Sequence, residues 1–138
     1  MYPNYLIHYI MMNIRELQET DYVDYLRLIN IFRETFFTEE QFIEILKIMK
    51  TNSIIIVLEL ENRLIGTGTI LFEIKFIHNI SKIAHIEDIC IDTEFRGKGY
   101  GTLLINHLIE YSKKNGSCTP NYILNADPLG SAYLNVIR

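Results

Sequence analysis

One six-residue stretch constrains this chain more than any other. It reads Arg96-Gly97-Lys98-Gly99-Tyr100-Gly101 and lies between a strand-like apolar run and a helix-like run. Glycine at three alternate positions lets the backbone adopt conformations that a Cβ atom forbids, so several N–H groups can point into one concavity. The helix that follows adds its own unpaired N–H groups and the positive end of its dipole. With Arg96 and Lys98 beside it, this loop predicts a binding site for a diphosphate.

The spacing of the glycines separates this loop from two common phosphate-binding motifs. A P-loop requires G-x-x-x-x-G-K-[ST], which the sequence does not contain. A dinucleotide-binding fingerprint requires G-x-G-x-x-G, whereas the glycines here read G-x-G-x-G. The alternative that involves no ligand is a glycine-rich turn on a solvated basic corner.

The size and composition of the chain fit one domain, residues 1–138. The chain has 138 residues, of which 49% are hydrophobic, which is enough for a real core. Its formal charge of −4 and the lack of a broad basic patch argue against general nucleic-acid binding. Cys90 and Cys118 form no C-x-x-C pair, so neither a zinc site nor a disulfide framework is expected. Cys90 is interpreted as a small core residue.

The N-terminal residues fit neither a signal peptide nor a membrane span. The apolar run at residues 5–14 is short and is interrupted by polar residues. The patterned part begins near Ile14, so residues 1–12 are interpreted as an N-terminal extension, with Met11 or Met12 as alternative start residues. We expect a cytoplasmic protein that does not associate with membranes.

The spacing of apolar and capping residues predicts elements in the order βααβββ(β)αβ. The expected strands are 14–17, 54–60, 64–72, 85–92 and 122–124, and the expected helices are 19–31, 38–49 and 102–114. Thr38 and Gln41 form a capping box at the start of the second helix. This order predicts an α/β (α+β) fold, a mixed sheet with helices on its faces.

Further short segments fall in a fixed order before the glycine loop. They are Ile14-Arg15-Glu16-Leu17 with Asp21-Tyr22, Ile65-Gly66-Thr67-Gly68-Thr69, Lys75-Phe76-Ile77-His78 and His85-Ile86-Glu87-Asp88-Ile89. With these segments, the chain from about residue 14 to residue 116 resembles one family within the GNAT superfamily, the glucosamine-6-phosphate N-acetyltransferases. Arg96-x-x-Gly99-x-Gly101 is similar to the loop with which GNAT enzymes hold the pyrophosphate of acetyl-CoA.

The resemblance implies a reaction and an architecture. The reaction is acetyl transfer from acetyl-CoA to the amine of D-glucosamine 6-phosphate, which gives N-acetylglucosamine 6-phosphate and CoA on the route to UDP-N-acetylglucosamine. The implied mechanism is direct attack of the neutral amine on the thioester, without a metal. The implied fold is a GNAT-type mixed, mostly antiparallel sheet flanked by helices. A homodimer is also implied, because the family's sugar site lies near a subunit interface.

The resemblance also implies which residues form the site. By this resemblance, the CoA pyrophosphate is bound by the glycine loop, which comprises Arg96, Gly97, Lys98, Gly99, Tyr100 and Gly101. The pantetheine and the thioester carbonyl are bound by the backbone of Ile89, Cys90 and Ile91. The residues that the resemblance implies in contact with the sugar phosphate are Lys75, Phe76, Ile77, His78, Glu87 and Asp88.

Glu87 and Asp88 carry the expected amine chemistry. In a regular strand they face opposite sides, so only one enters a cleft unless a bulge turns the other. A carboxylate there could orient the attacking amine and remove its proton, directly or through water. The alternative is a surface carboxylate beside a buried one that is satisfied by a hydrogen bond. Lys75 and His78 could bind the phosphate, or could simply be solvated.

The resemblance ends after Gly116, and residues 117–138 are interpreted as a truncated or divergent tail. The family's closing strands have no counterpart in this interpretation, which leaves a sheet edge that a partner could cover. Ser131-Ala132-Tyr133 is interpreted as the remnant of a family helix. Tyr133 is therefore the candidate for the tyrosine that serves the departing CoA thiolate.

Two other functions stay open from the sequence. One is a GNAT enzyme with another acceptor, such as a polyamine or a peptide N-terminus, which an acidic cleft would favour. The other is a truncated, non-catalytic module for acetyl-CoA binding or dimerisation, which would bind CoA without releasing thiol on any amine.

Overall fold

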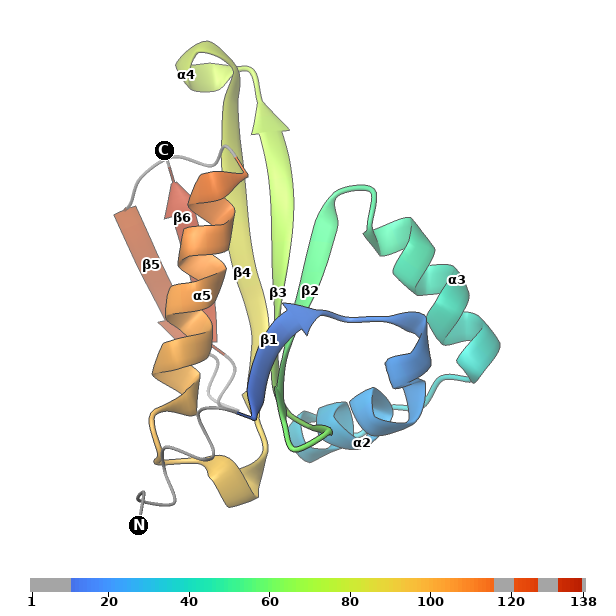
Figure 1. The fold of residues 1–138 in the computed structure, drawn as a ribbon. Helices are drawn as coiled ribbons and strands as arrows, with labels where there is room; N and C mark the ends of the chain where they lie inside the picture. Colours follow the sequence, from blue (N-terminus) through green and yellow to red (C-terminus); the bar gives the residue numbers. More distant parts are fainter. Residues whose placement is uncertain (1–10, 116–120, 127–131, 138) are drawn as a thin grey trace.

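The structure is a computed structural model that describes residues 11–115, 121–126 and 132–137. Its elements are, in chain order, β1 (Met12–Glu16), the 3-10 turn η1 (Glu19–Asp21), α2 (Tyr22–Phe32), α3 (Glu39–Met49), β2 (Ser53–Leu60), β3 (Arg63–Lys75), α4 (Ile77–Ile80), β4 (Ser81–Ile91), the 3-10 turn η2 (Thr93–Phe95), α5 (Tyr100–Lys114), β5 (Asn121–Ala126) and β6 (Ala132–Ile137) (Figure 1).

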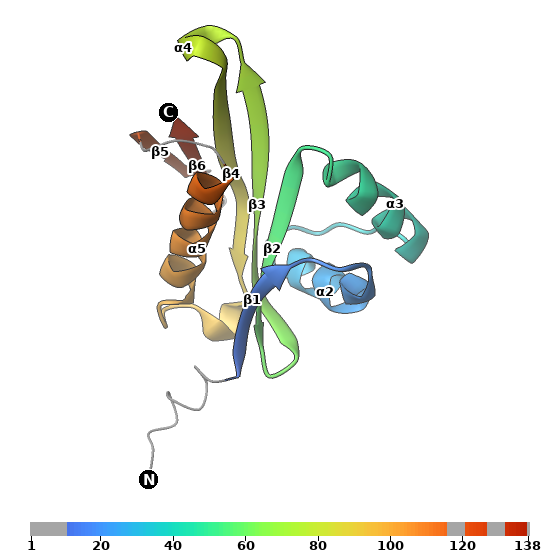
Figure 2. The same ribbon diagram turned by 45° about the horizontal axis from the view of Figure 1, so that its top comes forward.

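The strands form one six-stranded sheet in the order β1-β2-β3-β4-β6-β5. Every neighbouring pair of these strands is antiparallel. Helices α2 and α3 cover one face of the sheet and α5 covers the other, as Figures 1 and 2 show from two directions. The expected α/β architecture, a largely antiparallel sheet flanked by helices, is confirmed.

Two apolar cores hold these layers together. Under α2 and α3, Leu28, Phe42 and Leu46 pack with Ile55 and Cys90, so the interpretation of Cys90 as a core residue is confirmed. The expected capping box begins α3: Thr38 Oγ1 accepts a hydrogen bond from the Gln41 N–H, and Gln41 Oε1 accepts one from the Thr38 N–H.

On the opposite face, Leu104 and Leu108 of α5 are fully buried against the sheet. A Cβ atom at Gly68 would lie 2.6 Å from Cδ1 of Leu108. A side chain at position 68 would therefore force Leu108 to shift, which accounts for a glycine where α5 packs against β3.

The C-terminal strands correct the expectation for the tail. Ala132–Ile137 is a strand and not the remnant of a helix. It pairs with β4 through Ala84↔Val136, His85↔Asn135 and Ile86↔Leu134, and β5 then pairs with β6. The run from Ala132 to Ile137 contains tyrosine, valine and isoleucine, which favour strands. Strand β4 therefore has a partner along part of its edge.

A hairpin projects beyond the rest of the sheet, and we call residues 73–82 the arm (Figures 1 and 2). Its strands pair through Glu73↔Ile83, Ile74↔Lys82 and Lys75↔Ser81, and α4 forms its tip. The sequence pattern is less regular over residues 73–80, where the predicted order has only an optional strand. In the structure, the antiparallel pairing of β3 with β4 extends through this stretch as far as Lys75.

Candidate active site

The glycine loop has the conformation that its sequence predicts. Gly97 and Gly99 have φ angles of 73° and 87°, in the left-handed region, and Gly99 is the N-cap of α5. Apart from its neighbours along the chain, a Cβ atom on either residue would meet no described atom within 4 Å. Open space therefore lies in front of a backbone that ends at a helix N-terminus, which is the arrangement that accommodates a diphosphate.

Positive charge surrounds this loop. The exposed Arg96 side chain donates a hydrogen bond from Nε to the carbonyl oxygen of Ile91, 2.9 Å away. The Lys98 ammonium lies 5.5 Å from the centre of the Phe95 ring. The first turn of α5, which the structure describes in full, contains no acidic residue. The positive end of the α5 dipole and two cationic side chains thus belong to the same loop.

Asp92 fixes the connection between β4 and this loop. Its carboxylate is 1% exposed and accepts hydrogen bonds from Arg27 Nη1 at 3.0 Å, Arg63 Nη2 at 2.9 Å and the Glu94 N–H at 3.1 Å. Burial by itself raises the pKa of Asp92, but the Glu94 N–H and the two guanidinium groups outweigh it, so the pKa lies below its usual value. The carboxylate is therefore charged at neutral pH and anchors the turn.

The role of Asp92 was missed at the sequence level. Its signal is an aspartate that directly follows an apolar strand and caps a short turn through Glu94. The partners Arg27 and Arg63 lie 65 and 29 residues away along the chain, so sequence spacing does not reveal them.

A bulge in β4 separates the two neighbouring carboxylates. Thr67 pairs with Cys90, but Thr69 pairs with Glu87, so one extra residue lies in β4 opposite Gly68. Asp88 has a φ of 52°, a left-handed conformation that aspartate tolerates better than most residues. A bulge re-aims a side chain and leaves backbone groups out of the ladder. Asp88 is exposed, whereas Glu87 is half-buried.

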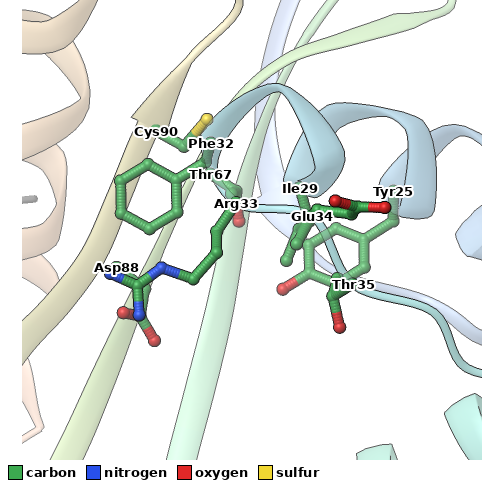
Figure 3. Close-up of a pocket in the computed structure, with 9 residues that line it drawn as sticks. All are labelled: Tyr25, Ile29, Phe32, Arg33, Glu34, Thr35, Thr67, Asp88 and Cys90. Carbon is green, nitrogen blue, oxygen red and sulfur yellow. The ribbon is translucent and has the colours of Figure 1, made fainter. Parts of the chain in front are cut away.

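Asp88 lines a polar cavity of about 280 Å³, which we call the polar cavity (Figure 3). Its walls come from α2 and the segment after it, from β3 and from β4: Tyr25, Ile29, Phe32, Arg33, Glu34, Thr35, Thr67, Asp88 and Cys90. In Figure 3 the Arg33 side chain extends toward Asp88. The lining of the cavity thus contains both a carboxylate and a guanidinium group.

Two buried groups of this cavity keep their protons. Burial raises the pKa of the Tyr25 hydroxyl well above its usual value, so the hydroxyl remains a hydrogen-bond donor. Burial likewise raises the pKa of the Cys90 thiol to about 11. Because only a thiolate is a good nucleophile, Cys90 is not suited to carry an acetyl group.

The structure does not bring the Lys75-Phe76-Ile77-His78 segment to Asp88 within one chain. Lys75 lies on β3 six residues beyond Thr69, the residue that pairs with Glu87, which is a distance of about 20 Å along a strand. Lys75 Nζ is 3.1 Å from Glu73 Oε1, and His85 Nε2 is 2.9 Å from Glu73 Oε2. The side chains of His78 and Tyr133 lie outside the described part, although their backbones belong to α4 and β6.

The described residues contain no group of three or more His, Cys, Asp or Glu side chains placed to hold a metal ion. In the same part of the chain, no helix is both long and apolar enough to cross a membrane.

Comparison with known proteins matches residues 12–127 to the model of the acetyltransferase (GNAT) family. Glucosamine 6-phosphate N-acetyltransferase 1 of Dictyostelium discoideum is 39% identical over 80 residues, which cover 54% of this chain and 51% of that protein. The glucosamine 6-phosphate N-acetyltransferase of Arabidopsis thaliana is 36% identical over 58 residues, 42% of this chain and 39% of that protein. The chain therefore matches about half or less of the length of these relatives.

Solved structures give longer matches. The crystal structure of glucosamine-6-phosphate N-acetyltransferase from Arabidopsis thaliana superposes with a TM-score of 0.72 at 29% identity and covers 77% of each chain. An acetyltransferase of Trypanosoma brucei superposes with a TM-score of 0.77 at 25% identity, over 85% of this chain and 84% of that one.

Proposed function

The chain belongs to the acetyltransferase (GNAT) family, and we propose that it transfers the acetyl group of acetyl-CoA to the amine of D-glucosamine 6-phosphate. The products are N-acetylglucosamine 6-phosphate and CoA, a step towards UDP-N-acetylglucosamine. One observation carries this proposal: strand β4 joins a carboxylate in a polar cavity, Asp88, to an open glycine loop at a helix N-terminus. The names of the relatives support the choice of acceptor.

The residues of the loop fit the CoA pyrophosphate. Gly97 and Gly99 leave room for close approach of two phosphates, and Arg96, Lys98 and the α5 N-terminus supply positive charge. The backbone of Ile89, Cys90 and Ile91 continues from the bulge toward this loop and would hold the pantetheine arm. Acetyl-CoA supplies the acetyl group as a thioester, which an amine attacks directly.

Asp88 would handle the amine. An amine is protonated at neutral pH and attacks only as the neutral form, so it must lose a proton next to the thioester. The Asp88 carboxylate can accept a hydrogen bond from the ammonium group, orient it and take the proton directly or through water. The Tyr25 hydroxyl, which stays protonated, can donate a hydrogen bond in the same cavity. Tyr133 remains a prediction for the group that protonates the departing thiolate.

The phosphate of the acceptor calls for a cation, and two sources are available. Arg33 lines the polar cavity in the same chain. Lys75 and His78 lie on the arm, so they would approach a cavity only from a second subunit. We therefore propose that Arg33 contacts the phosphate and that Lys75 and His78 of a partner chain complete the site.

Removal of the phosphate should weaken the acceptor strongly. We expect kcat/KM for glucosamine 6-phosphate to exceed that for glucosamine by about tenfold to a hundredfold, because a hydrogen bond to a charged group contributes about 1.5–3 kcal/mol. CoA thiol release measured with both sugars tests this. In Lys75→Ala, KM for glucosamine 6-phosphate should rise while KM for glucosamine stays the same. Equal kcat/KM values for the two sugars would refute the assignment of the acceptor.

We also expect a homodimer held by the arm. Ile74, Phe76, Ile77 and Ile80 are 61–94% exposed there, an apolar surface that water disfavours. Sedimentation velocity at micromolar concentration should show a dimer, and Phe76→Glu should shift it toward monomer. Val23→Glu is the matched control, because Val23 is 78% exposed on α2, away from the arm. A wild-type protein that sediments only as a monomer would contradict the proposal.

A further inference from the structure

A second cavity, which we call the apolar cavity, lies beside the polar one. It has a volume of about 220 Å³ and lies between α2, α3 and the sheet. Most of the residues that line it are apolar: Ile29, Phe37, Phe42, Ile45, Leu46, Met49 and Ile55. An apolar cavity of about 150 Å³ is enough to bind benzene, so this one has room for a phenyl ring or a short alkyl chain.

The two cavities meet at Asp88. Tyr25, Ile29 and Asp88 line both of them. The polar cavity continues from this junction past Arg33, Glu34 and Thr35, whereas the apolar cavity continues past stacked aromatic rings. An amine placed at the Asp88 carboxylate can therefore extend its substituent in either direction.

We propose that the site also acetylates small primary monoamines that carry an apolar substituent, such as pentylamine or 2-phenylethylamine. The ammonium group binds at Asp88 and the substituent occupies the apolar cavity. This inference rests on the proposed acetyl transfer at Asp88. The ammonium group first loses one proton through Asp88 to water. The neutral amine nitrogen then forms a bond to the acetyl carbon, the carbon–sulfur bond breaks, the nitrogen loses a second proton to water, and the CoA thiolate takes up a proton from water.

The charges around the apolar cavity select a monoamine. Among the described residues that line it, Asp88 is the one acidic side chain, and the remaining polar ones are the hydroxyls of Tyr25 and Thr69 and the amide of Gln41. A second ammonium group at the far end of the substituent would lie against apolar side chains with no carboxylate to pair with, which is costly. Diamines are therefore disfavoured, although their chain length suits the cavity.

The first experiment measures CoA thiol release from the full chain with propylamine, butylamine, pentylamine and cadaverine. We expect kcat/KM to rise about fourfold for each added methylene, because each buried CH₂ contributes a nearly constant transfer free energy. Pentylamine should exceed cadaverine, its diamine counterpart, at least tenfold. Equal values for all four amines, or a preference for cadaverine, would overturn the proposal.

The second experiment uses two matched variants of α3. Ile45 lines the apolar cavity and is 51% exposed, whereas Ile48 is 58% exposed on the same helix and does not line it. Ile45→Gln should lower the ratio of kcat/KM for pentylamine to that for glucosamine 6-phosphate about fivefold, since half of an isoleucine side chain loses its apolar contact. Ile48→Gln should leave that ratio unchanged, and an equal drop in both variants would contradict the assignment of the cavity.

Failure of the proposed function can be told apart from failure of this inference. If glucosamine 6-phosphate is turned over and pentylamine is not, the proposed function stands and the inference about the apolar cavity is overturned. If neither amine reacts, NMR titration of 2-phenylethylamine into the CoA-bound chain shows whether the apolar cavity binds the amine. Chemical-shift changes in α3 that Ile45→Gln weakens support the cavity, and no changes in wild type refute it.

Discussion

Gly99→Val is expected to lower the affinity for CoA at least a hundredfold while the domain stays folded. Gly99 has a φ of 87°, and its Cβ position faces open space rather than packed atoms. A valine would therefore not clash with the protein but would fill the space in front of the α5 N-terminus. A left-handed conformation costs a residue with a Cβ about 1–2 kcal/mol, which a typical domain survives. Isothermal titration with CoA and a thermal melt measure the two effects separately.

Asn79→Val is the matched control for this substitution. Asn79 has a φ of 59° and lies in α4, at the tip of the arm, whereas Gly99 lies at the opposite end of β4 (Figure 1). Both variants thus place a β-branched residue in the left-handed region, but only one does so at the loop. CoA affinity should be lost in Gly99→Val and kept in Asn79→Val. Unchanged CoA affinity in a folded Gly99→Val variant would exclude this loop as the pyrophosphate site.

Local signals in the sequence predicted the loop and the capped helix well. Glycines at alternate positions before a helix leave few backbone conformations, and Gly97 and Gly99 adopt the left-handed one. The capping box at Thr38 and Gln41 depends on residues three apart, so its hydrogen bonds follow directly from the sequence. Such features do not depend on distant parts of the chain.

Features set by tertiary contacts were harder to predict. Asp92 binds Arg27 and Arg63 from α2 and β3, and no spacing rule connects these three residues. The helix expected at Tyr133 is a strand because Ala132–Ile137 can pair with β4, a contact between segments about 50 residues apart. The cavities depend on how α2 and α3 lie against the sheet. The sequence therefore predicted Asp88 as a candidate for the amine chemistry, which stays a prediction, but it did not predict the second, apolar cavity beside it.

Asp88→Asn is expected to lower kcat for glucosamine 6-phosphate about a hundredfold or more, with the affinity for acetyl-CoA unchanged. A positioned general base contributes about 10²–10⁴-fold to a rate, and an amide cannot accept the proton. Asparagine has the same shape and also tolerates a positive φ, so the bulge should remain. Steady-state kinetics and CoA titration test both halves of this expectation.

Glu87→Gln is the matched control, because Glu87 is the carboxylate next to Asp88 in the bulged part of β4. Glu87 is the adjacent carboxylate but lines neither the polar nor the apolar cavity, so kcat should fall less than threefold. The pH profile adds a readout that a merely structural role would not change. In Asp88→Asn the rate should climb with pH, because the amine then loses its proton to water without help, and the gap to wild type should narrow. A large loss in Glu87→Gln with normal turnover in Asp88→Asn would mean that the other carboxylate faces the amine.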